Sequence, residues 1–92
     1  MKIRYKRRAL EDLESIHSYI AQFDREAAKR VIGRIERVIG RLAYLPWSGR
    51  PGVVPGTRIL VIPRVPYVAI YRVREDAVEM IAVLHTARRR RS

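Results

Sequence analysis

The sequence predicts a small α+β domain in which an antiparallel pair of helices packs against a small antiparallel sheet. Apolar residues recur every three or four positions between residues 10 and 45, as on amphipathic helices. Strand-like runs follow between residues 58 and 85. The 92 residues contain no internal repeat and no linker, so we expect one domain, 1–92, of which 87–92 is a basic tail. The expected element order is β-α-α-β-β-β.

The N-terminal part of the chain predicts a strand followed by a helix. Residues 2–6, KIRYK, alternate polar and apolar side chains, which suits a short edge strand. The period then lengthens to that of a helix. Its apolar line comprises Leu10, Leu13, Ile16, Ile20 and Phe23. Glu11, Asp12 and Glu14 fall in its early turns, where the helix dipole favours negative charge.

A second helix is expected to begin after Asp24, which suits an N-cap. Its apolar seam comprises Ala28, Val31, Ile35, Val38, Leu42 and Leu45. The two helices, joined around Asp24, should form an antiparallel hairpin. Arg30, Arg34, Arg37 and Arg41 share one face of the second helix, which is either a solvated face or a binding ridge.

The segment 46–57, PWSGRPGVVPGT, predicts a loop because it holds three Pro and three Gly. We expect Trp47 within it to cover one end of the core. Strands are expected at 58–62, 67–74 and 78–85, and their short connections favour antiparallel hairpins.

The last hairpin predicts an uncovered apolar face. We assume that Glu75 and Asp76 form a two-residue turn. The expected pairs on one face are Arg72 with Glu79, Ile70 with Ile81 and Val68 with Val83; those on the other are Tyr71 with Met80, Ala69 with Ala82 and Tyr67 with Leu84. The helices can cover only one face, so a partner chain should cover Val68, Ile70, Ile81 and Val83.

The charge balance indicates an anionic partner. Twenty Lys and Arg oppose nine Asp and Glu, which gives a net charge of +11. Nucleic acid, an anionic membrane or an acidic protein would each attract such a chain. Biased codon usage could explain the preference for Arg over Lys, but not the excess of positive charge. The absence of Cys excludes disulfides and thiolate sites and favours a reducing cytoplasm. Neither a signal peptide nor a membrane span is expected.

Two histidines are the candidates for acid–base chemistry. His17 lies off the apolar line of the first helix, so we expect it at the surface. His85 ends the last strand beside arginines, as a general base for RNA cleavage would, with Arg58, Arg72 or Arg88 stabilising the transition state. The favoured interpretation is that His85 caps or packs at the strand end, or is part of a contact surface. No metal-ligand spacing and no phosphate-binding loop occur, so no metal or cofactor is expected.

Five segments in order resemble the ParE branch of the RelE/ParE toxin superfamily. They are ALEDLESIHSYIA, GRPG, GTRILVI, PYVAIYRV and VLHTARR, and the resemblance covers nearly the whole chain. It implies the RelE-like fold and a bacterial type II toxin, held in a hetero-oligomer by a cognate ParD-like antitoxin. The resemblance also implies that the toxin contacts operator DNA only as part of the complex with its antitoxin. ParE-like toxins inhibit DNA gyrase, whereas RelE-like relatives cut mRNA on the ribosome, so the fold does not choose the target.

Residue details favour the gyrase branch. Ribonuclease members usually carry an arginine just after the position matching Tyr67, where this chain has Val68, and often end with an aromatic residue, which TARRRRS lacks. ParE tails often continue with Trp, where this chain has Arg90. We expect Arg88, Arg89, Arg90 and Arg91 to contact the target. A ribosome-dependent endonuclease and a basic nucleic-acid-binding module stay open as alternatives.

Overall fold

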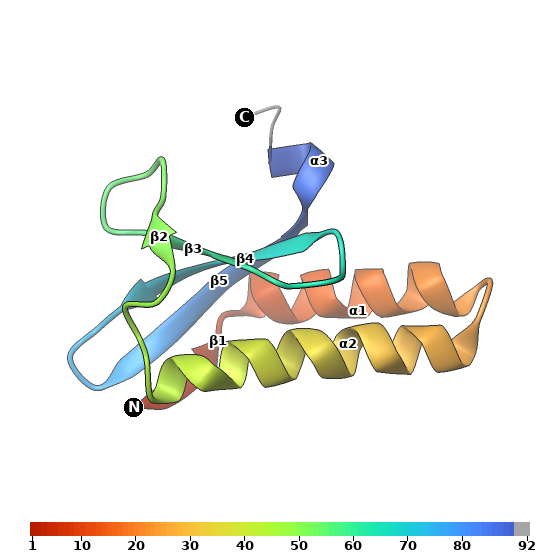
Figure 1. The fold of residues 1–92 in the computed structure, drawn as a ribbon, viewed down its shortest axis with the longest axis horizontal. Coiled ribbons are helices and arrows are strands. Elements are labelled where there is room, and N and C mark those ends of the chain that lie inside the picture. The colour runs from red at the N-terminus through yellow and green to blue at the C-terminus, as the bar shows by residue number, and fades with distance from the viewer. Residues whose placement is uncertain (90–92) are drawn as a thin grey trace.

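The protein has two layers, a helical hairpin and a five-stranded sheet, in a computed structural model that describes residues 1–89 (Figure 1). The elements are β1 (Lys2–Tyr5), α1 (Arg7–Ala21), α2 (Arg25–Gly40), the 3-10 turn η1 (Arg41–Ala43), β2 (Arg50–Pro51), β3 (Arg58–Val61), β4 (Tyr67–Val73), β5 (Ala77–His85) and α3 (Thr86–Arg89). Both long helices cover the same face of the sheet, and α3 lies on the other side. The predicted α+β class is confirmed.

The sheet is mixed rather than wholly antiparallel. Its strand order is β1-β5-β4-β3-β2, and β1 pairs in parallel with the first part of β5. The pairs β3–β4 and β4–β5 are antiparallel, as predicted. β2 also pairs antiparallel with β3, although it lies within residues 46–57, which were expected to form a loop. The helical hairpin and three strands separate β1 from β5 in the chain. No local sequence pattern therefore predicts that these two strands pair in parallel.

The helical hairpin follows the predicted periodicity in its buried residues, but Leu10, Phe23 and Leu45, which were expected on the apolar lines, are 50%, 75% and 62% exposed. The Asp24 carboxylate accepts a hydrogen bond of 3.0 Å from the Ala27 N–H, which confirms it as the N-cap of α2. The first turn of α1 contains no acid, because the helix begins at Arg7, so the expected dipole contacts of Glu11, Asp12 and Glu14 do not form. The helices bury Ala9, Leu13, Ala28, Ile35, Val38 and Ile39.

A β-bulge changes the predicted register of the last hairpin. The pairs Arg72–Glu79 and Tyr71–Met80 are confirmed, but Ile70 then faces Ala82, so Ile81 is the extra residue. The other four predicted pairs are wrong by one position; the structure instead pairs Ala69 with Val83, Val68 with Leu84 and Tyr67 with His85. A one-residue slip turns each later side chain to the other face. Val83 therefore joins the helix-side core with Val78 and Met80.

The loop before β3 is anchored on a buried tyrosine. The Tyr71 hydroxyl accepts a hydrogen bond from the Gly49 N–H and donates one to the Pro46 carbonyl, at 2.9 and 2.8 Å. A Cβ on Gly49 would lie 2.6 Å from that hydroxyl, so glycine is required there. Trp47 does not cover the core as predicted: it is 63% exposed, with the Arg58 guanidinium 5.2 Å from its ring centre.

Candidate partner-binding groove

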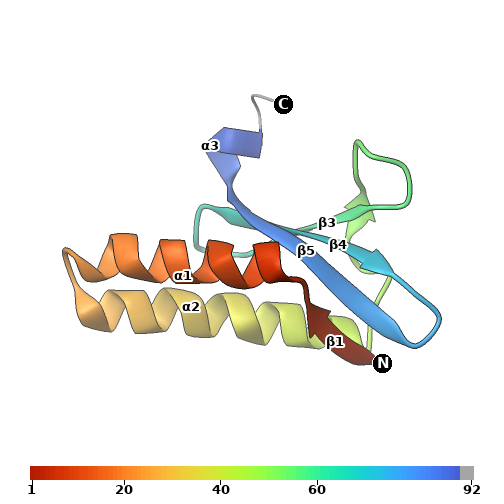
Figure 2. The same cartoon turned by 180° about the vertical axis from the view of Figure 1, so that it is seen from behind.

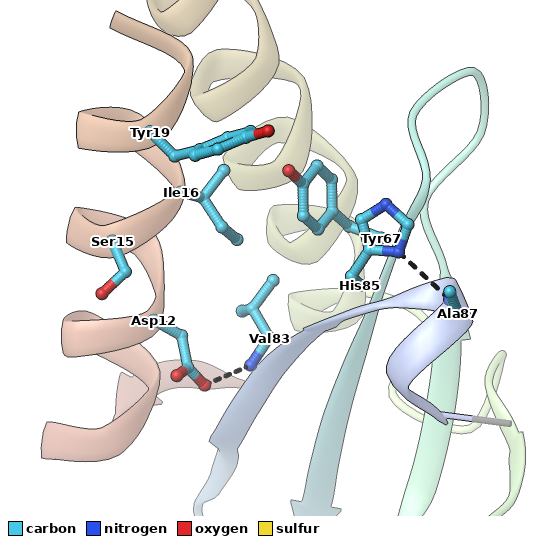
Figure 3. Close-up of a pocket in the computed structure, with 8 residues that line it drawn as sticks. All are labelled: Asp12, Ser15, Ile16, Tyr19, Tyr67, Val83, His85 and Ala87. Atoms are coloured by element: carbon cyan, nitrogen blue, oxygen red, sulfur yellow. Dashed lines mark hydrogen bonds between the residues drawn. The ribbon is translucent and has the colours of Figure 1, made fainter. Parts of the chain in front are cut away.

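A groove of about 590 Å³ lies between α1 and the C-terminal part of β5 (Figure 3). It is lined by Asp12, Ser15, Ile16, Tyr19, Tyr67, Val83, His85 and Ala87. α1 contributes the first four of these residues, and the strand ends and the start of α3 contribute the rest. Figure 2 shows α1 beside β5 on the side of the sheet that β1 leaves open.

The groove exists because β1 is shorter than β5. β1 pairs only with Ala77–Met80, and its edge ends where the Lys6 N–H donates to the Met80 carbonyl. β5 continues for five more residues, up to His85, without a strand on this side. The bulge at Ile81 begins at the same place. A strand edge with free backbone groups is a surface that other chains can pair with or cover.

Asp12 holds the bulged strand against α1. Its Oδ2 accepts a hydrogen bond of 2.8 Å from the Val83 N–H, which is partly buried. The Arg8 guanidinium lies 3.3 Å from the same oxygen. β1 does not extend beside this part of β5, so the Asp12 carboxylate supplies the acceptor for the Val83 N–H.

Replacing Asp12 by Ala should lower the free energy of unfolding by about 1–3 kcal/mol, because it leaves the Val83 N–H without its acceptor. Asp12→Asn keeps an oxygen acceptor and should lose less, chiefly the contact with the exposed Arg8. Chemical denaturation of both variants measures the difference. Equal stabilities for the Ala and Asn variants would show that the hydrogen bond to Val83 contributes nothing.

Aromatic side chains form one wall of the groove. Tyr19 and Phe23 are 63% and 75% exposed, and their rings meet edge to face at 5.7 Å. Burial, and to a smaller extent the neighbouring Tyr19, raise the pKa of Tyr67 above its ordinary value. The Tyr67 phenol is therefore a neutral polar group in the groove. Apolar bodies with polar ends suit a protein partner.

His85 is engaged in the fold. Its Nδ1 accepts a hydrogen bond of 3.1 Å from the Ala87 N–H at the start of α3. Its ring meets Tyr67 edge to face, with centroids 5.4 Å apart. Both contacts orient the imidazole at the turn from β5 into α3. His17 lies exposed on α1, as predicted.

Two arginines of the endonuclease alternative, Arg58 and Arg72, are not brought to His85. Arg72 pairs across from Glu79 and Tyr67 across from His85, so Arg72 and His85 are separated by about five residues of strand, or about 17 Å. Arg58 donates hydrogen bonds to the carbonyls of Gly49 and Trp47 at 3.0 and 3.4 Å, and is thus part of the loop anchor. The side chain of Arg88 lies outside the described part of the chain.

The four residues expected to meet a partner are divided between two surfaces. Val83 lines the groove, while Ile70 and Ile81 are half-buried on the sheet face away from the helices. Val68 is only 1% exposed. For the expected target-binding tail, Arg90 and Arg91 lie outside the described residues, as do the side chains of Arg88 and Arg89; the backbone of Thr86–Arg89 is helical.

Sequence reasoning missed Asp12, Ser15, Tyr19 and Tyr67 as neighbours in one groove. Tyr19 carried a usable signal, because a large aromatic residue stands off the apolar line of α1 and beside the exposed Phe23. Within residues 1–89, no three potential metal-ligating side chains converge. None of the helices described is long and apolar enough to cross a bilayer.

Comparison with known proteins places these features in a family. The sequence model of the family described as the ParE toxin of the type II toxin–antitoxin system parDE matches residues 3–90. The candidate toxin Y4kP of Sinorhizobium fredii is 44% identical over 84 residues, which cover 91% of this chain and 86% of that protein. Toxin RelE2 of Caulobacter vibrioides is 37% identical over 81 residues, covering 88% and 90%.

A solved structure agrees with these sequence matches. A chain of the chromosomal ParDE toxin–antitoxin system from P. aeruginosa superposes with a TM-score of 0.83 at 27% identity, covering 92% of this chain and 95% of that one. The family match spans every helix and strand that surrounds the groove. The chain therefore belongs to the ParE toxin family, and it is the toxin component of a type II toxin–antitoxin system.

Proposed function

We propose that this toxin inhibits DNA gyrase by binding it and performs no chemistry of its own. The observation that carries the proposal is the separation of His85 from Arg58 and Arg72, together with the hydrogen bond that the exposed His85 accepts at Nδ1 from the Ala87 N–H. An endonuclease needs a base and a cation at one phosphate. Val68, at the position where ribonuclease relatives carry an arginine, supports the same conclusion.

A ParD-like antitoxin is the proposed partner of the groove. The toxin carries a net charge of +11, so an acidic antitoxin would be attracted to it before contact. The groove supplies an open strand edge, exposed aromatic rings and a concave surface, which suit a segment that is partly helical and partly extended. We expect the segment to bury more than about 1,000 Å² in total and to reach the sheet face at Ile70 and Ile81. Operator DNA would then be contacted through the antitoxin.

The function is tested with purified gyrase and with growing cells. Wild-type toxin and His85→Ala should both inhibit supercoiling and accumulate cleaved DNA–gyrase complexes, because no base is needed. Cells should filament and show DNA-damage signalling while bulk translation continues.

The matched control is Asp12→Asn, which alters the groove without touching His85. Early cleavage of mRNA on ribosomes that disappears in His85→Ala but persists in Asp12→Asn would refute the gyrase proposal and identify a ribonuclease.

A further inference from the structure

A second hollow is lined by four arginines and two valines. It lies between α2 and the β3–β4 turn and has a volume of about 360 Å³. The residues that line it are Arg30, Val31, Arg34, Arg37, Arg64 and Val65. We call Arg30, Arg34, Arg37 and Arg64 the arginine hollow. The three helical arginines stand four and three residues apart, so they share one face over a rise of about 10 Å.

Backbone features at Arg64 and Gly33 accompany this cluster of cations. Arg64 has a φ of +69°, which is the only positive value at a residue other than glycine in the described chain. This left-handed conformation disfavours an arginine, for which glycine would be the unstrained choice. On α2, a Cβ on Gly33 would lie 3.5 Å from Nη1 of Arg37, so the guanidinium folds back over the glycine toward the preceding turn.

The arginine hollow has no anionic partner within the described part of the protein. The ion pairs among the described residues join Arg4 to Asp76, Arg8 to Asp12, Lys29 to Glu26 and Arg74 to Glu79, and none of them includes an arginine of the hollow. Like charges three and four residues apart on a helix repel one another. Four cations around one concavity therefore raise the energy of the free protein, and a bound anion would remove that cost.

We propose that the arginine hollow binds phosphate groups of a duplex DNA backbone, independently of base sequence. Guanidinium groups match phosphate oxygens with paired hydrogen bonds. Phosphates of one strand recur about every 3.4 Å along the duplex axis, so a row about 10 Å long can meet two or three of them. An acidic peptide fits less well, because the hollow offers only Val31 and Val65 as apolar contacts and no strand edge to align a backbone.

This proposal does not depend on which enzyme the toxin inhibits. Backbone contacts would fix the toxin on DNA without reading its sequence. The surface lies on α2 and the β3–β4 turn, whereas the groove lies on α1, β4, β5 and α3, so the two could be occupied at the same time.

The test measures binding of the full chain to a short fluorescent duplex of mixed sequence over a series of salt concentrations. The variant Arg30→Gln/Arg34→Gln/Arg37→Gln should bind at least about tenfold more weakly, and the slope of log affinity against log salt should fall by about 2–3. The control Lys2→Gln/Lys6→Gln/Arg7→Gln removes the same charge from exposed positions outside the hollow and should change both quantities much less.

Arg64→Gly gives an independent readout. Glycine accepts the positive φ, so this variant should melt no lower than the parent protein, yet it should bind the duplex more weakly. Equal losses in the two triple variants would mean that only net charge matters and would overturn the proposal. So would unchanged binding in the arginine variants, or binding of polyglutamate without binding of DNA. If the arginine triple variant fails to fold, Arg64→Gly decides the question alone.

Discussion

Replacing Tyr19 and Phe23 together by aspartate should abolish neutralisation by the antitoxin while the toxin stays folded and toxic. Both rings are more than half exposed and pack on each other beside the groove, so their removal opens no cavity in the core. Buried aromatic residues at interface centres contribute about 2 kcal/mol or more each. Loss of both should weaken antitoxin binding by about a thousandfold. Rescue of growth by co-expressed antitoxin, and calorimetric titration of the purified pair, measure the effect.

The matched control is Tyr44→Asp/Leu45→Asp. These side chains are 87% and 62% exposed and lie beyond the C-terminal end of α2, away from the groove. The control should be neutralised as well as the wild type. Neutralisation that fails in the control and survives in Tyr19→Asp/Phe23→Asp would place the antitoxin on another surface.

The helical layer could be predicted from the sequence because its information is local. A repeat of three and four residues defines the buried side of α2, and Asp24 makes its cap with Ala27, three residues away. The antiparallel order of β3, β4 and β5 was likewise available from their short connections. The resemblance of five segments to the ParE branch added the family, which the comparisons confirm.

The groove could not be predicted, because it depends on contacts between distant residues. The Val83 N–H is bonded to Asp12, 71 positions earlier in the chain. That bond lies just after the bulge at Ile81, which turns Val83 from the expected outer face to the helix side. Strict alternation along β5 gives no sign of an extra residue. The early end of β1, which leaves this edge of β5 open, depends on a pairing between the two ends of the chain.

The sequence predicted only part of the arginine hollow. The face shared by Arg30, Arg34 and Arg37 follows from helical spacing, which by itself favoured a solvated face over a binding ridge. What distinguishes them is Arg64, which a turn in the left-handed region brings to the same hollow from another element. Arg41, the fourth member of the predicted face, lies in the 3-10 turn after α2 and does not line the hollow.

Truncation after Ala87 should leave the fold and antitoxin binding largely intact and strongly weaken toxicity. The shortened chain keeps the Ala87 N–H that donates to His85, and it keeps every residue that lines the groove. It removes the consecutive cations Arg88, Arg89, Arg90 and Arg91, which we expect to contact carboxylates or phosphates of the target. Together such contacts at the rim of an interface contribute about 1–3 kcal/mol, or roughly 5- to 150-fold in affinity.

The control for truncation is the full-length chain with the same four arginines replaced by glutamine, which keeps the length of α3 and removes only charge. Both variants should lose gyrase binding, and the difference from wild type should shrink as salt is raised, because exposed charges are screened within about 8 Å at physiological ionic strength. A truncated chain that unfolds, beside a folded and fully toxic glutamine variant, would assign the tail a structural role. If both variants stay folded and fully toxic, the contact with gyrase must be made elsewhere, and the arginine hollow on α2 is then the next surface to test.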